Sequence, residues 1–110
     1  MQQAAFLETT RFGDKVQIDK MMETPFSKEI RICMAKGNVM KEHSAPGAIT
    51  IMVLNGCVSI TSMDATVELT DGGMVCFDAN VPHSLEANEK SVLRLTLSKN
   101  DSIQRVISLT

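Results

Sequence analysis

Hydrophobic and polar residues alternate along much of the chain with the two-residue period of β-strands. The alternation is clearest in residues 16–19, 29–32, 58–61, 65–69 and 91–97. Because successive side chains of a strand point to opposite faces of a sheet, each segment is expected to place one face in a core. Residues 49–54 and 74–77 are almost wholly apolar, which predicts strands that are buried on both faces.

Turn-forming residues separate these segments. Asn55-Gly56 is the strongest turn signal, since both residues tolerate positive φ and suit a tight hairpin. Residues 62–64, 71–73 and 88–90 carry similar signals. Strands of about six residues at this short spacing predict a sandwich or barrel. A parallel α/β sheet is excluded because it needs long helical crossovers, for which the chain has no room.

The two ends of the chain are less regular. Residues 1–14 fit either a short helix or an added edge strand. After Asn100 the pattern allows one or two helical turns, with Asp101 as N-cap and Gln104 three residues later as a weak capping-box signal. We expect a single all-β domain over residues 1–110, with a core barrel over about residues 15–98 and short N- and C-terminal extensions.

Composition fits a single globular domain. The chain has 110 residues, of which 44% are hydrophobic and 22% charged. Its longest apolar run, residues 48–54, is far shorter than the roughly 20 residues of a membrane-spanning helix. The N-terminus lacks the basic start and long apolar stretch of a secretory signal, so we expect a cytoplasmic protein. In that reducing compartment Cys33, Cys57 and Cys76 should be free and mostly buried thiols.

Charge and aromatic content argue against nucleic acid as a partner. The net charge is −2 and no stretch is strongly basic, whereas nucleic-acid binding needs clustered Lys and Arg. The chain also has no Trp or Tyr for base stacking. We therefore expect neither a nucleic acid nor a membrane among its partners.

Candidate chemistry centres on the only two histidines, His43 and His83. Each lies at the edge of an expected strand beside loop residues, where a barrel mouth presents functional side chains. A single histidine near a strand end is more often a hydrogen-bonded structural residue than a ligand or base. The similar setting of the two histidines instead favours a shared pocket.

Residues 37–56 resemble the first motif of the cupin family. In that motif a Gly, five further residues and His-x-His precede a Glu and a final Gly. Gly37, His43 and Gly56 match it, whereas the second His position falls on Ala45 and the Glu position on Ile49.

Residues 72–83 resemble the second cupin motif, in which Pro-x-Gly and then His follow a Gly. Gly72 and His83 match, and the Pro and Gly positions hold Asp78 and Asn80. Asn80 can still adopt the left-handed turn that Gly would supply. The phrase over residues 80–87 is very similar to that of small stand-alone cupins.

The resemblance to small cupins implies a double-stranded β-helix, the RmlC-like jelly roll. It implies that His43 and His83 point into one cavity of the barrel. The expected ligand-binding residues are these two imidazoles and an apolar wall formed by Ile51, Val53 and Phe77. Small cupins also commonly pair through sheet edges, so we expect a homodimer, with the strands near residues 16–22 and 29–34 as donors.

Many cupins bind a divalent metal through three His and one Glu, and this chain departs from that set. Ala45 and Ile49 cannot coordinate a metal, which leaves His43 and His83 as an incomplete set of metal ligands. A third ligand would have to be an acid from elsewhere. Glu42 and Glu86 should face away from the pocket, and Asp78 could reach inward from its loop. A divalent metal ion is therefore an alternative cofactor rather than the main expectation.

Two classes of function fit these residues. The first is a binding module that holds a small organic ligand between His43 and His83. The second is a small metal-dependent or histidine-based enzyme of the isomerase, decarboxylase or dioxygenase type, as cupin relatives include. In that case His43 or His83 would act as general acid or base. The missing ligand positions favour the binding module.

Overall fold

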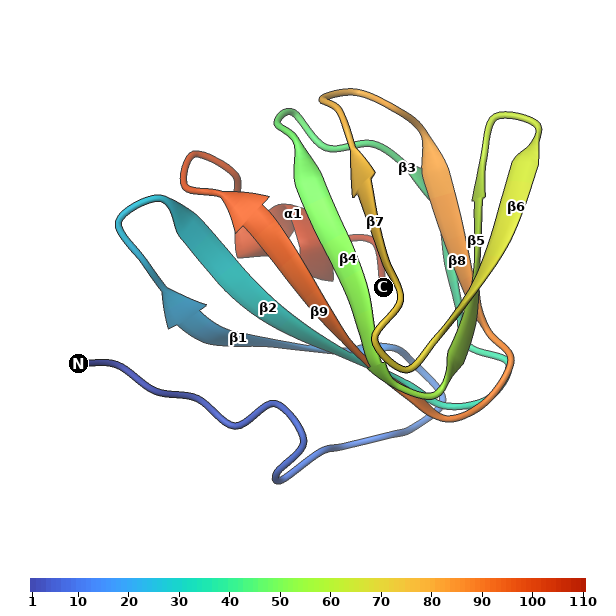
Figure 1. Cartoon of the computed structure of the whole chain (residues 1–110), viewed down its shortest axis with the longest axis horizontal. Coiled ribbons are helices and arrows are strands. Elements are labelled where there is room, and N and C mark those ends of the chain that lie inside the picture. The colour runs from blue at the N-terminus through green and yellow to red at the C-terminus, as the bar shows by residue number, and fades with distance from the viewer.

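Nine β-strands and one short helix make up the computed structural model, which describes residues 1–110 (Figure 1). The elements are β1 Gln17–Glu23, β2 Ser27–Met34, β3 Val39–His43, β4 Ile49–Asn55, β5 Cys57–Ser62, β6 Ala65–Thr70, β7 Met74–Phe77, β8 His83–Ala87, β9 Ser91–Ser98 and α1 Ile103–Ile107.

The strands form two antiparallel sheets. The five-stranded sheet has the order β1-β2-β9-β4-β7, and the four-stranded sheet has the order β3-β8-β5-β6. Consecutive strands often lie in different sheets, so the chain crosses repeatedly between them, as in a jelly roll. The prediction of an all-β double-stranded β-helix is confirmed.

The alternation in the sequence builds the core between the two sheets. In β4, Ile49, Ile51 and Val53 are buried, while Thr50, Met52 and Leu54 are half-buried, so the expectation that residues 49–54 are buried on both faces holds fully for one face only. The other strands contribute inward residues in the same way, and 17 buried apolar residues form one cluster. Burial of each large aliphatic side chain contributes roughly 1.5–3 kcal/mol, so this cluster is the main source of stability.

The prediction of a hairpin at Asn55-Gly56 is wrong. Gly56 follows β4 of one sheet and precedes β5 of the other, so the turn is a corner between the sheets. Gly56 has φ +117°, a conformation that favours glycine. The hairpin signal at residues 62–64 is confirmed, because Ser62 pairs with Ala65 across a two-residue loop.

The prediction that residues 74–77 are buried on both faces is also wrong. Strand β7 is the edge of the five-stranded sheet, so it has a neighbouring strand on one side only. Met74 and Cys76 are exposed, and Val75 and Phe77 are half-buried.

The cysteines are free, and Cys33 and Cys57 are buried, as expected.

Residues 1–14 form neither of the expected elements, since β1 begins only at Gln17 and no helix precedes it. The segment is held against the outer face of the sheet by the buried Arg31. Its guanidinium donates to the carbonyl oxygens of Glu8 at 2.7 Å and Thr9 at 3.2 Å, and to Asp19 at 2.9 Å. The N-terminal segment is thus attached to the sheet by a charged side chain and not by strand pairing.

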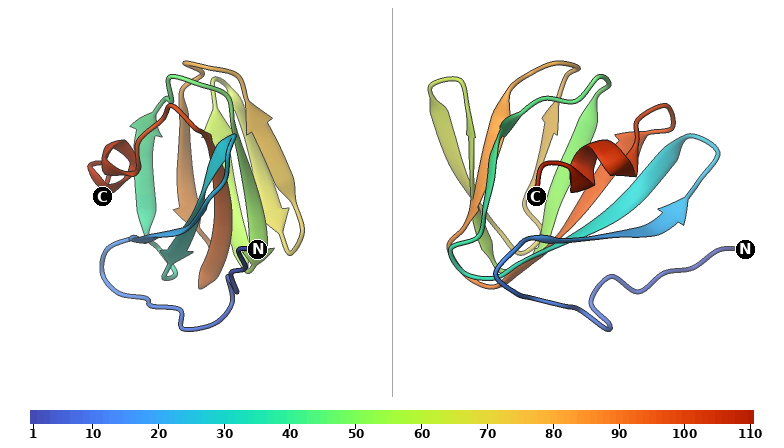
Figure 2. Two further views of the ribbon diagram at one scale, coloured as in Figure 1. Left: turned by 90° about the vertical axis from the view of Figure 1, so that its left-hand side faces the viewer. Right: turned by 180° about the vertical axis from the view of Figure 1, so that it is seen from behind.

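The C-terminal helix confirms the expected helical turns, but its N-cap is Ser102 rather than Asp101. The Ser102 hydroxyl accepts a hydrogen bond from the Gln104 amide at 3.1 Å. The Asp101 carboxylate is instead paired with Arg105. Figure 2 shows α1 lying across one open side of the sandwich. No helix is long and apolar enough to cross a membrane.

Candidate functional site

His43 and His83 face each other on neighbouring antiparallel strands. β3 pairs with β8, and the two histidines are register partners. Their ring centroids lie 4.4 Å apart with an interplanar angle of 65°. The two histidines are forty residues apart in the sequence, and the pairing of β3 with β8 brings their imidazoles together, as the sequence predicted.

An irregularity in β3 aims His43 inward. Met40 is buried, Lys41 and Glu42 are both exposed, and His43 is again half-buried. Strict alternation from Met40 would have turned His43 outward. The register shifts between Met40 and His43, which is the signature of a β-bulge, and bulges often re-aim side chains beside functional sites.

His83 is almost fully enclosed, with 1% of its surface exposed. One face of its ring stacks on Phe77, with centroids 4.5 Å apart and planes within 4° of parallel. Its Nδ1 lies 2.9 Å from the Val81 carbonyl oxygen, while its buried Nε2 has no hydrogen-bond partner.

The loop before His83 is tied to the loop after His43. Asn80 has φ +66°, which confirms the left-handed turn expected there. Its amide donates to the Ala45 carbonyl oxygen at 2.7 Å. Ala45 and Asn80 occupy motif positions that the cupin pattern gives to His and Gly. The pair therefore holds the two motif loops together through the backbone instead of through a metal ligand.

The backbone fixes the tautomer of both rings. His43 Nδ1 lies 2.6 Å from the Lys41 carbonyl oxygen, in the same way that His83 Nδ1 approaches Val81. Because a carbonyl oxygen only accepts, each Nδ1 donates its proton and each Nε2 of the neutral ring keeps a free lone pair.

Both imidazoles are held in the neutral form. Burial lowers the pKa of His43 below 6.5, and the nearby positive charge of Arg105 lowers it further, against the opposing effect of the Lys41 carbonyl. Burial also lowers the pKa of His83, with additional repulsion from His43 and Arg105. At neutral pH the site therefore presents two uncharged nitrogen acceptors.

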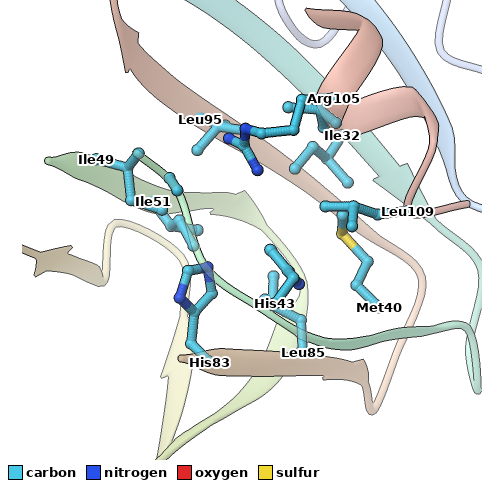
Figure 3. Close-up of a pocket in the computed structure, with 12 residues that line it drawn as sticks. Ile32, Met40, His43, Ile49, Ile51, His83, Leu85, Leu95, Arg105 and Leu109 are labelled. Atoms are coloured by element: carbon cyan, nitrogen blue, oxygen red, sulfur yellow. The ribbon is translucent and has the colours of Figure 1, made fainter. Parts of the chain in front are cut away.

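A small cavity lies beside the two rings, between the sheets and α1 (Figure 3). Its wall is mostly aliphatic and consists of Ile32, Met40, His43, Ala45, Ile49, Ile51, His83, Leu85, Leu95, Arg105, Val106 and Leu109. The free volume is about 10 Å³, which is room for about one water molecule. The residues of α1 and the turn after it close the cavity on one side.

Three of the five predicted ligand-binding residues line this cavity, namely His43, His83 and Ile51. Val53 does not line it and is instead a fully buried core residue further along β4. Phe77 also does not line it, but supports the site by stacking on His83.

Sequence reasoning missed the part of the wall that comes from the C-terminus: Arg105, Val106 and Leu109. The spacing of Asp101 and Arg105 is a visible signal for a helical ion pair. Nothing in the sequence indicates that this helix folds back over the barrel.

Arg105 is the one cationic side chain in the wall. Its Nε and Nη2 donate to the two carboxylate oxygens of Asp101 at 2.8 and 2.7 Å, and its Nη1 donates to the Ser44 carbonyl oxygen at 3.3 Å. Burial raises the pKa of Asp101, but the hydrogen bonds from Arg105 and the Ser102 amide outweigh burial and lower it. Asp101 is therefore ionised, and it fixes the orientation of the guanidinium.

The donor set does not fit a resident divalent metal. No group of three or more His, Cys, Asp or Glu side chains is placed to share an ion. Glu42, Asp78 and Glu86 are all exposed, so none completes the pair of imidazoles. Catalytic zinc usually has three protein ligands, and here the one charged side chain in the wall is a guanidinium, which repels a cation.

Comparison with known proteins agrees with the fold. A sequence profile described as "Cupin domain" matches residues 30–98. No curated protein sequence matches the chain.

Several solved structures share the architecture. An RmlC-like cupin protein from Desulfovibrio desulfuricans has a TM-score of 0.81 and 22% identity, covering 90% of this chain and 97% of its own. A cupin superfamily protein from Desulfitobacterium hafniense has a TM-score of 0.76 and 15% identity, with coverages of 89% and 92%. KdgF from a Halomonas species has a TM-score of 0.70 and 19% identity, with coverages of 80% and 83%. At these identities the likeness concerns the fold alone.

Proposed function

The chain belongs to the cupin domain family, and we propose that its barrel binds a small organic molecule at the cavity around His43 and His83. The observation that carries the proposal is the buried Nε2 of His83, which has no hydrogen-bond partner. Leaving a buried polar atom unpaired costs about 1–3 kcal/mol. A donor group on a ligand would recover that free energy, whereas buried polar groups with a purely structural role are usually paired.

The side chains that line the cavity indicate which chemical groups the ligand carries. Nine of the twelve lining residues are hydrophobic, which suits an apolar body. The two neutral Nε2 atoms accept hydrogen bonds, so they suit a hydroxyl or another donor on that body. Ile51 belongs to the apolar contact surface, and Phe77 would act by holding the His83 ring in place.

The site needs a change of shape to admit such a molecule, since its free volume is about that of one water. Met40 can yield by rotating its unbranched side chain. The larger opening would come from the C-terminal segment, which closes the cavity through Val106 and Leu109.

The two histidines make the proposal directly testable by NMR. Imidazole-labelled protein gives two Cε1–H signals, assigned with His43→Gln and His83→Gln variants. Titration with a panel of neutral, acidic and basic small molecules should yield compounds that move both signals together and lose affinity in His83→Gln. Binding that leaves both signals unmoved, or a panel without any compound that moves them, contradicts the proposal.

A histidine-based enzyme is the second candidate, because the lowered pKa of His83 keeps its Nε2 available as a neutral base. The cavity holds no carboxylate or hydroxyl side chain to act as a second acid or base, which favours binding over catalysis. Product signals that appear in the NMR samples and disappear in His83→Gln would reverse this preference.

A homodimer is also proposed, with only one of the two strands that the sequence indicated as interface donors. β2 is paired on both sides, so of the two expected donor strands only β1 has a free edge. Phe26, in the turn between β1 and β2, and Met74, on β7, have 78% and 56% of their surface exposed and offer apolar area around one shallow hollow. Light scattering should give twice the chain mass of 12.0 kDa, and a monomer mass contradicts the proposal.

A cytoplasmic location is proposed on the basis of the thiols. All three cysteines are unpaired, and the exposed Cys76 would be open to oxidation outside a reducing compartment. Cell fractionation tests this directly, and recovery from an extracellular fraction contradicts it.

A further inference from the structure

Resting on the proposed function, we propose that the ligand is a small carboxylic acid and that Arg105 binds its carboxylate. Arg105 is carried by the C-terminal segment that closes the cavity, so the same segment would be both lid and recognition element. The proposal follows from the geometry of the guanidinium, the charge of the cavity and the attachment of α1.

The guanidinium is oriented but only partly used. Asp101 occupies the edge formed by Nε and Nη2 through two short hydrogen bonds. The terminal edge, formed by Nη1 and the second hydrogen of Nη2, has only the 3.3 Å contact with the Ser44 carbonyl oxygen. That edge matches the two oxygens of a carboxylate in the paired geometry that makes Arg–carboxylate contacts strong.

The position of Arg105 places its guanidinium beside the site. Arg105 lines the same cavity as His43 and His83, and Figure 3 shows its side chain reaching from α1 over the cavity on the side of the two rings. Its positive charge is felt at both imidazoles. A small ligand in this cavity can therefore contact Arg105 and the imidazoles together.

The wall of the cavity contains no acidic side chain that would repel a bound carboxylate. None of the twelve lining residues is acidic. Asp101 is the nearest carboxylate, and it is already paired with Arg105 on the other edge of the guanidinium. A small acid with an apolar body, and with a hydroxyl for the imidazole Nε2 atoms, uses every polar group that the cavity presents.

The attachment of α1 permits it to move. The helix has five residues, too few to be stable without packing. The side-chain hydrogen bonds between the segment and the barrel are the long Arg105–Ser44 contact and one from the Lys28 ammonium to the Asp101 carbonyl oxygen. One backbone hydrogen bond, from the Asp101 amide to the Ser98 carbonyl oxygen at 3.0 Å, ties the start of the segment to the end of β9. The buried Val106 supplies the main apolar contact. A ligand could enter while this segment is displaced from the cavity. By pairing with Arg105 after the segment returns, the ligand would then hold the segment in its closed position.

The test compares acids with their amides, which have nearly the same shape but no charge. Acetate, lactate and benzoate are titrated alongside acetamide, lactamide and benzamide into the full chain, with the two histidine signals as readout. The variants are Arg105→Gln, the double change Asp101→Asn with Arg105→Gln, and the control Lys99→Gln. The double variant avoids leaving the buried Asp101 without a partner, and Lys99 is an exposed residue with no ion pair.

The proposal expects at least one acid to move both histidine signals and to bind at least tenfold more tightly than its amide. Both Arg105 variants should weaken that acid tenfold or more, while Lys99→Gln should change it less than twofold. Amides that bind as tightly as the acids, with no effect of Arg105→Gln, overturn the carboxylate assignment and leave the proposed pocket intact. If neither acids nor amides move the histidine signals, the carboxylate assignment is overturned. The proposed binding pocket is tested separately by the panel of neutral, acidic and basic molecules described above, and it is contradicted if no compound of that panel moves the signals.

Discussion

Gly56 occupies the corner where the chain passes from β4 in one sheet to β5 in the other, and Gly56→Ala tests whether that corner is required. Gly56 has φ +117°, so an added Cβ is strained whatever space it finds. The space is also absent. An ideal Cβ would lie 2.2 Å from the Ser91 hydroxyl oxygen, 2.6 Å from the Lys90 carbonyl oxygen and 2.7 Å from the Ser91 Cα.

The expected loss combines two effects. Forcing a non-glycine residue into this backbone region costs about 1–3 kcal/mol. The Ser91 hydroxyl can rotate away, but it would abandon its hydrogen bond with the Cys57 amide at 3.0 Å, worth roughly 0.5–1.5 kcal/mol. The two backbone atoms cannot rotate away, so the corner itself must shift. We expect a total loss of about 4 kcal/mol or more, at the upper end of single-residue effects.

Gly72→Ala is the matched control. Gly72 has φ +86° but no atom within 4 Å of its ideal Cβ, so it should lose only the backbone cost of about 1–3 kcal/mol. Urea unfolding followed by circular dichroism measures both variants. Equal losses in the two variants would refute the steric argument, and a loss below about 1 kcal/mol for Gly56→Ala would refute the strained corner as well.

Three further predictions concern the site and its surroundings. The signals of His43 and His83 should titrate with midpoints below 6.5 in the folded protein. Between those midpoints and pH 6.5 the unfolded chain therefore binds more protons than the folded protein. The free energy of unfolding should fall as the pH drops through this window and should not depend on these groups above it. A free energy of unfolding that rises on acidification contradicts this prediction. Cys76 should react with a thiol reagent in the native state and the two buried cysteines only after unfolding, so three fast thiols would refute their burial. Val106→Ala should destabilise α1 by about 2 kcal/mol, visible as roughly thirtyfold faster amide exchange in α1, and unchanged exchange would show that Val106 does not anchor the helix.

Much of the fold could be predicted from the sequence because strand alternation is local information. The inward positions of β4 were visible as Ile49, Ile51 and Val53, and the spacing of turn residues left room only for short antiparallel strands. The resemblance to the cupin motifs also implied that His43 and His83 face one cavity, whereas their pairing on neighbouring strands is seen only in the structure.

What failed depends on contacts between distant segments. Asn55-Gly56 has the composition of a hairpin, and only the different partners of β4 and β5 make it a corner. Met74–Phe77 is as apolar as an interior strand, but its place at the sheet edge leaves Met74 in solvent. The inward turn of His43 requires a bulge that alternation cannot foresee.

The same limit applies to the wall of the candidate site. The sequence pattern supplied the two imidazoles and Ile51, but it gave no reason to place Arg105 or Leu109 beside them. Their position depends on where a five-residue helix packs after the barrel is complete. Short C-terminal segments carry little periodicity, so their docking is decided by the surface that they meet.

The central claim is that two neutral imidazoles share one cavity that the C-terminal segment closes. The most direct measurement is an NOE experiment on the ligand-free protein, with the ring protons assigned from His43→Gln and His83→Gln. Rings with centroids 4.4 Å apart should show a strong mutual NOE. The absence of the NOE between the rings, in a protein whose strand NOEs confirm the jelly roll, would contradict the account.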